Sequence, residues 1–291
     1  MKITILSHCT IDEISRDGQV VETPGGPAGY CGITAKNMKF DVELRTMVGP
    51  DFKYANDLES KGLFLAKDSY SSNPTTRFLL KISGVDRELY LKTKCDPIEF
   101  HNSDTDGYIV SPVFDEVSED ILDQIREDSS FLLLDPQGYL RRTDNNNKIY
   151  LEKTLFDISK VTAIKTDPDE AFHLTGLRDK EAMLALQGKG VKHVLYTNKQ
   201  DIKMLVKDRL YHLHIPDIRI GDTTGVGDIF CAAFTCSYLK EKDSLWAICF
   251  AVGAAQAALE TKATGLSKVP NSGAIQQNAA YLYNLVKFSQ V

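Results

Sequence analysis

The stretch IGDTTGVGD, residues 220–228, follows an alternating segment and continues directly into the apolar stretch Ile229 to Leu239. This order predicts a strand over 213–220, a glycine loop and the start of a helix. Gly225 and Gly227 can adopt backbone angles that a side chain would forbid, so consecutive N–H groups can point into one concave space at the helix N-terminus. The stretch therefore predicts an anion-binding loop.

Asp228 ends this stretch and falls in the first turn of the predicted helix. The positive end of the helix dipole favours a carboxylate there, which predicts an ionised Asp228. A base beside an anion-binding loop indicates phosphoryl transfer to a hydroxyl, in which Asp228 takes the proton while the amides hold the charge on the phosphate. The alternative is a helix cap, because glycine and aspartate also cluster at helix starts for capping alone.

Residues 222–228, DTTGVGD, resemble the Asp-Thr-x-Gly-Ala-Gly-Asp signature of the ribokinase-like (PfkB) family of small-molecule kinases, with Val226 at the usual alanine. The resemblance implies that Asp228 is the catalytic base. It also implies that the amides of Gly225, Val226 and Gly227 form the anion hole, and that the two glycines contact the nucleotide.

The resemblance extends to residues 166–176, TDPDEAFHLTG, which are similar to the family's Lys-Pro-Asn-x-x-Glu-Ala-x-x-Leu-Thr-Gly segment. It implies that Glu170, and Asp167 in place of asparagine, help to position magnesium, a cation that takes few protein oxygens and keeps several waters. For Asp167 a helix cap is the alternative. Some members also hold potassium through the signature, which makes Asp222 and Thr224 candidates for a monovalent cation site.

The N-terminal region carries the expected substrate contacts. Lys2 to Leu6 predicts a strand, and Asp12 just beyond it matches a family aspartate that binds substrate hydroxyls; without the family it would be read as a turn residue. Gly25 and Gly26, before a helical stretch from Tyr30, resemble the start of the family's Gly-Gly-x-x-x-Asn substrate motif. The amide of that motif is missing here, which leaves the substrate open.

Two hairpins predict a small β lid formed by about 13–23 and 73–95. A lid excludes the water that would otherwise take the phosphoryl group. Arg77, Lys92 and Lys94 could reach a substrate phosphate from it, although charges on a solvated hairpin face are the simpler interpretation. Lids in this family often pair across a homodimer.

Strands and helices alternate from Gly107 onward, which predicts a doubly wound, mostly parallel α/β sheet within one domain, 1–291. The expected helices are 118–127, 148–158, 229–241, 245–260 and 272–287.

The ends of two predicted strands supply further candidates. Gln137, after strand 130–134, stands where the family often has a substrate-binding asparagine, with Arg141 or Arg142 nearby. Thr197 and Asn198 follow strand 194–197, where the family has a Thr-x-Gly-x-x-Gly phosphate turn. Neither glycine is present, but asparagine tolerates left-handed geometry, so nucleotide contacts are expected from these two residues.

Composition fits a cytoplasmic enzyme. The 291 residues carry a formal net charge of −6 without a basic run, which argues against nucleic-acid binding and for a small partner. The six cysteines form no C-x-x-C pair, which indicates reduced, mostly buried thiols. The N-terminal apolar run is too short for a signal peptide, and the near-apolar stretch 246–259 is shorter than the roughly 20 residues of a membrane span.

These features predict a kinase that transfers the γ-phosphoryl group of ATP, with Mg²⁺ and in some members K⁺, to a hydroxyl of a small sugar or a cyclic polyol such as inositol. A nucleoside kinase with Tyr30 or Phe78 against the base, and a sugar-phosphate kinase using lid cations, are enzymatic alternatives. The non-enzymatic alternative is a ligand-binding regulator with the kinase fold; the presence of Asp228 argues against it.

Overall fold

A computed structural model describes residues 1–16, 18–83, 86–215 and 222–291. Asp17 and residues 84–85, at the two predicted hairpin turns, lie outside the described residues. So do residues 216–221, which include most of the predicted strand 213–220. The described part of that strand ends at His214.

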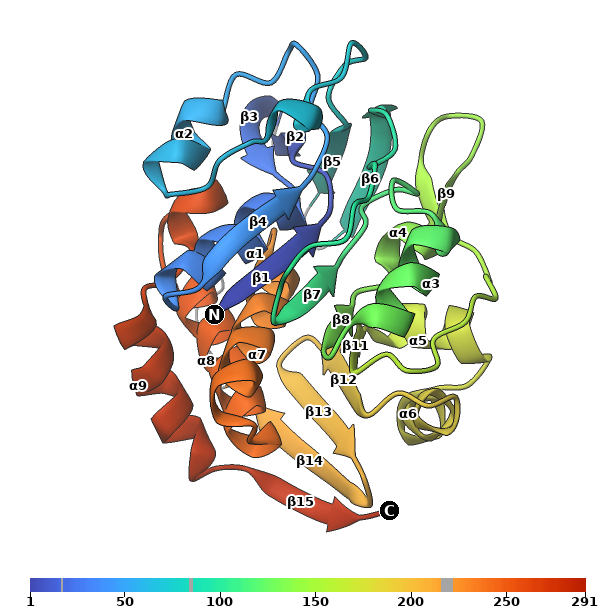
Figure 1. Ribbon diagram of the computed structural model, residues 1–291, viewed down its shortest axis with the longest axis vertical. Helices are drawn as coiled ribbons and strands as arrows, with labels where there is room; N and C mark the ends of the chain where they lie inside the picture. Colours follow the sequence, from blue (N-terminus) through green and yellow to red (C-terminus); the bar gives the residue numbers. More distant parts are fainter. Residues whose placement is uncertain (17, 84–85, 216–221) are drawn as a thin grey trace.

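A nine-stranded sheet forms the centre of the molecule (Figure 1). Its strands are β1 (Lys2–Leu6), β4 (Asp41–Arg45), β7 (Gly107–Val110), β8 (Leu132–Leu134), β11 (Ala163–Thr166), β12 (His193–Asn198), β13 (Asp201–Val206), β14 (Arg209–His214) and β15 (Lys287–Gln290). The order is β15-β14-β13-β12-β11-β8-β7-β1-β4. Neighbours from β4 to β12 are parallel, and those from β12 to β15 are antiparallel. β7 and β8 are buried throughout, as expected for parallel strands covered on both faces.

Helices cover both faces of this sheet, which confirms the predicted doubly wound α/β class. One layer, on the left in Figure 1, contains α1 (Pro27–Asn37), α7 (Val226–Glu241), α8 (Ser244–Glu260) and α9 (Ser272–Tyr283). The other, on the right, contains α3 (Glu119–Asp128), α4 (Gln137–Leu140), α5 (Pro168–Thr175) and α6 (Asp179–Gly188). The short α2 (Ala55–Ser60) lies near the lid.

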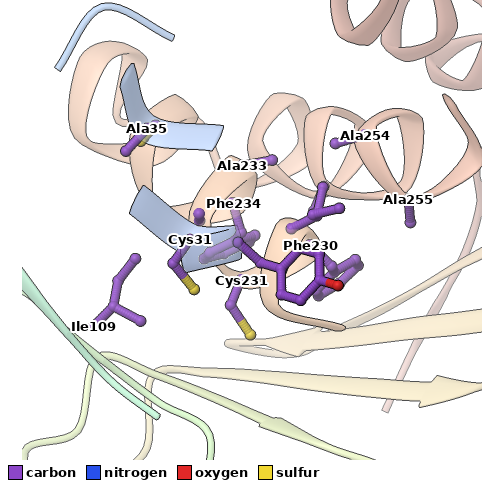
Figure 2. Close-up of a cluster of buried hydrophobic side chains, with 14 of the residues drawn as sticks. Cys31, Ala35, Ile109, Phe230, Cys231, Ala233, Phe234, Ala254 and Ala255 are labelled. Carbon is purple, nitrogen blue, oxygen red and sulfur yellow. The ribbon is translucent and has the colours of Figure 1, made fainter. Parts of the chain in front are cut away.

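The first layer is almost uniformly apolar. Figure 2 shows Phe230 and Phe234 of α7 gathered with Cys31 of α1 and Ala254 of α8. A Cβ added to Gly253 of α8 would lie 2.8 Å from the backbone nitrogen of Ala279, so α8 and α9 approach backbone to backbone. The six cysteines are all free and buried, as predicted. No helix in the described part of the chain is long and apolar enough to cross a membrane.

A second sheet has four strands: β2 (Thr10–Arg16), β3 (Gln19–Gly25), β5 (Arg77–Ser83) and β6 (Asp86–Thr93). Its order is β3-β2-β5-β6, with both predicted hairpins present and β2 parallel to β5. We call these four strands the lid sheet. The pairing of β2 with β5 joins residues 66 positions apart in the chain, for example Ile11 with Arg77.

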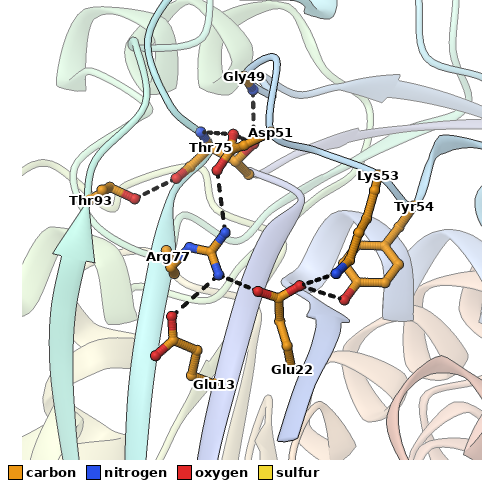
Figure 3. A network of polar contacts seen from close by, with 9 residues as sticks. All are labelled: Glu13, Glu22, Gly49, Asp51, Lys53, Tyr54, Thr75, Arg77 and Thr93. Carbon is orange, nitrogen blue, oxygen red and sulfur yellow. Dashed lines mark hydrogen bonds and ion pairs between the residues drawn. The ribbon is translucent and has the colours of Figure 1, made fainter.

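Arg77 holds this sheet to the rest of the molecule (Figure 3). Its guanidinium lies 3.2 Å from Glu13 Oε1, 2.5 Å from Glu22 Oε2 and 3.4 Å from Asp51 Oδ2. Asp51 Oδ1 also accepts hydrogen bonds from the N–H and hydroxyl of Thr75, both at 2.7 Å. Asp51 therefore connects the loop after β4 to the segment before β5. Arg77 itself is fully engaged by carboxylates, and Lys94 is paired with Asp115 at 3.0 Å.

Several predicted boundaries were also wrong. Residues 148–158 form no helix: β10 (Ile149–Leu151) pairs with β9 (Arg141–Thr143), and 152–158 have no regular structure. Ile149 and Leu151 have the period of a strand, with the exposed Tyr150 between them. The last helix ends at Tyr283 instead of residue 287, because the following segment pairs with β14 as an edge strand.

Helices α1 and α7 each begin three residues earlier than predicted. Their N-caps are glycines with positive φ, Gly26 at 85° and Gly225 at 72°. Pro27 at the first position of α1 is preorganised for the helix. The apolar pattern of each helix starts later than the helix itself, so this pattern places both starts too late.

Candidate active site

A cavity of about 810 Å³ lies between the lid sheet and the ends of the central strands. The lid sheet contributes Asp12, Phe78 and Arg87 to its lining. The loops after β8 and β11 contribute Asp135 and Asp167, and the start of α7 closes the cavity. This is the carboxyl edge of the parallel strands, where open α/β sheets bind ligands.

Gly225 shapes the anion-binding loop. A Cβ at this position would lie 2.4 Å from the ring of Tyr30, so both the space and the φ of 72° require glycine. The N–H of Val226 donates to the Thr223 carbonyl at 3.4 Å, which closes the turn before the helix. Gly227, in the first turn of α7, lines the cavity, where N–H groups lack partners within the helix. The loop thus places a helix N-terminus against the cavity, as predicted.

Asp228 lies in the first turn of α7, lines the cavity and is 9% exposed. Burial, followed by the nearby carboxylate of Asp135, raises its pKa to about 7, while Lys165 and Arg141 act to lower it. The predicted effect of the helix dipole is thus outweighed by desolvation. A carboxylate with a pKa near neutrality is well matched to proton abstraction at physiological pH.

Asp12 lies in β2 of the lid sheet, in the segment that follows β1, and lines the cavity. The hydroxyl of Thr10 donates to its Oδ1 at 2.8 Å, and burial raises its pKa to about 6. The backbone of β3 runs directly against it: a Cβ at Gly25 would lie 1.9 Å from Asp12 Oδ2, and a Cβ at Gly26 2.3 Å from the His8 carbonyl. Both glycines are needed for this close approach.

Lys165 is a candidate site residue that the sequence analysis did not single out. It is the next-to-last residue of β11 and lines the cavity. Its Nζ atom lies 3.2 Å from Asp135 Oδ2 and 3.4 Å from Glu170 Oε2. A Cβ on Gly227 would come 3.8 Å from this Nζ, so the ammonium borders the anion-binding loop. Although burial acts to lower the pKa of Lys165, the two carboxylates outweigh it and raise that pKa. The sequence does carry a signal for Lys165. Lysine is rarely buried unless it is paired, and this lysine stands near the end of a buried strand, just before a helix cap.

Asp167 and Glu170 form a capping box at the start of α5. Asp167 Oδ1 accepts from the N–H groups of Asp169 at 2.9 Å and Glu170 at 2.8 Å, and Glu170 Oε2 accepts from the Asp167 N–H at 2.8 Å. Asp167 is therefore a helix cap and also lines the cavity. In the described residues no cluster of three acidic, histidine or cysteine side chains forms a metal site. One oxygen of each carboxylate is used by the cap, which leaves the other to contact a hydrated magnesium through water.

Asp222 is held by a lysine. Lys268, at the end of the 3₁₀ turn η2 (Gly265–Lys268), donates to the Asp222 carbonyl at 2.9 Å, and its Nζ lies 3.1 Å from Asp222 Oδ2. The Thr224 N–H donates to the other carboxylate oxygen at 2.9 Å. Although burial acts to raise the pKa of Asp222, the Thr224 N–H and Lys268 outweigh it and lower that pKa. Of the two residues expected to hold potassium, Asp222 thus binds the Lys268 ammonium, and Thr224 binds the other oxygen of the same carboxylate.

Of the remaining candidates, Gln137 lines the main cavity, whereas Thr197 and Asn198 do not. Gln137 is the first residue of α4 and lines the cavity together with Arg141 of β9, whose guanidinium donates to the Val113 carbonyl at 3.0 Å. Thr197 lines a separate apolar cavity of about 140 Å³ that shares Gly227 with the main one. Asn198 is exposed beyond it, and the left-handed residue of this turn is Lys199, with φ 54°.

Residues 100–271 match the model of the pfkB family of carbohydrate kinases, which is more than half of the 291 residues. The chain belongs to this family. It is therefore a phosphotransferase with an alcohol group as acceptor. Comparison with curated proteins gives no match.

Solved structures of PfkB relatives share the fold. A pyrophosphate-dependent kinase in the ribokinase family, solved as a sulfate complex, is 22% identical with a TM-score of 0.80 and covers 91% of this chain and 98% of its own. The ribokinase of Thermotoga maritima is 16% identical with a TM-score of 0.77, covering 96% and 99%. The ribokinase of Arabidopsis thaliana in complex with ribose and ATP is 15% identical with a TM-score of 0.74, covering 95% and 98%. At these identities the matches show a common fold.

Proposed function

We propose that this PfkB kinase transfers the γ-phosphoryl group of ATP to a hydroxyl of a small sugar or cyclic polyol, with Asp228 as the general base. The observation that carries the proposal is the position of the Asp228 carboxylate, buried at the start of α7 and facing the same cavity as Asp12 and Lys165. A base, a cation and a helix N-terminus then converge where a hydroxyl and a phosphate would meet.

Asp228 takes the proton of the substrate hydroxyl as the hydroxyl oxygen forms a bond to the γ-phosphorus. The bond from that phosphorus to the bridging oxygen breaks, and ADP leaves with the bond electrons. The N–H groups at Gly225, Val226 and Gly227 and the Lys165 ammonium stabilise the charge on the transferred group.

Magnesium, when bound with the nucleotide, supplies charge neutralisation on the phosphates. Asp167 and Glu170 would hold it through water, each with the oxygen that the capping box leaves over. The lid sheet, which contains most of the predicted lid segments 13–23 and 73–95, would exclude water from the cavity. We propose a cytoplasmic location, which the six free cysteines support. We also propose that two copies of the chain form a homodimer by pairing their lid sheets.

The lining favours a polyol as substrate. Asp12, Gln137 and Arg141 offer an acceptor, an amide and a guanidinium for several hydroxyls, while Phe78 offers an apolar face. Tyr30 is 1% exposed and packed against Gly225, so it has little surface left to stack a nucleobase. One structural neighbour is a pyrophosphate-dependent kinase bound to myo-inositol, which supports inositol as the first compound to test.

Pyrophosphate is a second candidate donor. The apolar cavity beside Thr197 and Gly227 measures only about 140 Å³, and the phosphate-turn glycines expected near it are absent. Pyrophosphate needs the anion-binding loop but no base pocket. Three structural neighbours are described as pyrophosphate-dependent, with TM-scores of 0.78 to 0.80.

The test is phosphorylation of a panel of pentoses, hexoses, inositols, nucleosides and sugar phosphates, with ATP or pyrophosphate as donor and magnesium present. The proposal predicts turnover of one sugar or polyol with ATP. Turnover only with pyrophosphate would replace the donor and leave the base and acceptor in place. Ligand binding without turnover on any compound would favour the binding-protein alternative.

A further inference from the structure

Lys268 makes an unusual set of contacts for a lysine. Its side chain is 0% exposed, and it lies 5.8 Å from the centre of the Tyr30 ring. Among the described residues, its close oxygen contacts, at 2.9 and 3.1 Å, are the carbonyl and one carboxylate oxygen of Asp222. A fully buried ammonium is costly unless it is paired and hydrogen-bonded, and the contacts with Asp222 supply this pairing for Lys268.

The residue it binds opens the anion-binding loop. Asp222 Oδ1 accepts from the Thr224 N–H at 2.9 Å, and Oδ2 lies 3.4 Å from the Gly265 nitrogen. Through these bonds Asp222 connects the loop before α7 to the turn η2. The conformation of Asp222 therefore sets where the chain enters Gly225 and the start of the helix.

The family resemblance made Asp222 one of two candidate residues for potassium, and here its oxygens contact Lys268. A lysine ammonium carries the same single positive charge and donates its hydrogens to the same carbonyl and carboxylate oxygens. It is delivered by the chain and cannot dissociate. A potassium ion and the Lys268 ammonium could not occupy the contact position on Asp222 together, so the donor set does not fit a bound cation.

We propose that Lys268 is a positioning residue that takes the place of a monovalent cation, so that the enzyme holds its anion-binding loop without potassium. This inference rests on the proposed kinase function. In this proposal Lys268 acts through Asp222 and the anion-binding loop, without touching the reacting atoms.

Two substitutions separate charge from space. Lys268→Ala removes the ammonium and leaves room beside Asp222, whereas Lys268→Met removes the charge and keeps most of the volume. Lys240→Ala is a matched control: that lysine also donates to a backbone carbonyl, that of Met38, at 2.6 Å and lies over the Phe40 ring. It lies at the far end of α7, about 18 Å along the helix from Asp228.

Turnover is measured with tetramethylammonium as the inert cation and with K⁺, Na⁺ or NH₄⁺ added at constant ionic strength. The wild type and Lys240→Ala should change by less than about 2-fold, whereas Lys268→Ala should lose activity and regain about 10-fold or more with K⁺ or NH₄⁺. Lys268→Met should stay impaired under all salts. A wild type that requires K⁺, or a Lys268→Ala variant that is equally active in all salts, would overturn the proposal.

A second readout does not depend on turnover. If potassium enters the space left in Lys268→Ala, K⁺ should raise the melting temperature of that variant more than Na⁺ does, and should leave the wild type and Lys268→Met unchanged. This result would support the proposal even if no acceptor in the panel were phosphorylated. If neither substitution yields folded protein, the wild-type titration still decides, because a K⁺-dependent rate or melting temperature contradicts an internal cation.

Discussion

The Nζ atom of Lys165 lies 3.2 Å from Asp135 Oδ2, and this pair stands directly beside the start of α7. Asp135 raises the pKa of Asp228 and Lys165 lowers it, so the two residues set the proton affinity of the proposed base from opposite sides. Glu170, 3.4 Å from the same ammonium, completes a buried cluster of one cation and three carboxylates.

The rate should depend on the protonation of Asp228. Its folded-state pKa is about 7, and the ionised form is the base, so kcat/KM should fall as the pH drops below about 7 and level off above it. The measurement is kcat/KM for the acceptor from pH 5 to 9 at saturating donor. A rate independent of pH below 7 would mean that no group with this pKa must be ionised.

Lys165→Met should change both rate and pH profile. Because Lys165 lowers the pKa of Asp228, its removal should move the acidic limb of the profile to higher pH and reduce kcat by about 10²-fold or more. It also leaves Asp135 and Glu170 buried without their cation, which should cost about 3–5 kcal/mol of folding stability. If the variant folds and the limb does not move, Lys165 has no electrostatic role at Asp228.

Gly225→Ala and Gly227→Ala should separate folding from anion binding. Alanine at 225 meets the Tyr30 ring at 2.4 Å and requires a positive φ, so this variant should lose both stability and activity. Alanine at 227 meets no atom closer than 3.8 Å and suits a helix, so the melting temperature should hold. Its methyl group would enter the anion space beside Lys165, and the KM for the phosphoryl donor should rise about 10-fold. Equal kinetics for Gly227→Ala and the wild type would argue against an anion site there.

Arg77→Met tests whether the lid arginine serves the structure or the substrate. Its guanidinium is bound by Glu13, Glu22 and Asp51, so the substitution should destabilise the protein by about 1–2 kcal/mol with kcat changed less than about 3-fold. Lys53 and Arg77 lower the pKa of Glu22 to about 2. That stability is present above the unfolded pKa near 4.5 and is lost as pH falls towards 2, so the stability difference between the variant and the wild type should shrink over this range. The measurements are thermal unfolding between pH 7 and 3 and the KM for a phosphorylated acceptor. A large rise in that KM would mean that Arg77 binds the substrate.

The parallel part of the fold could be predicted from sequence where a strand is a continuous apolar run and where a helix begins at a glycine loop. β8, with the sequence LLL, and the signature before α7 are examples. The segment 148–158 could not be predicted in the same way. Its apolar residues, Ile149 and Leu151, fit a short strand only when the facing hairpin strand, β9, is known.

The site was predicted where a motif carries it and missed where distant segments meet. Asp228 and Gly225 stand within one continuous signature. Lys268 lies 46 residues from Asp222 in the chain, and nothing local to either residue predicts their contact. The raised pKa of Asp228 could not be predicted either, because the helix dipole is visible in the sequence while burial against Asp135 requires the folded structure.

The most direct test of the account is the turnover of Asp228→Asn with the acceptor identified by the panel. Asparagine keeps the shape of the side chain and cannot take the hydroxyl proton. We expect kcat to fall about 10²-fold or more, with acceptor affinity, measured calorimetrically, changed by no more than a few-fold. A variant that binds the acceptor and turns over at the wild-type rate would contradict the assignment of Asp228 as the base.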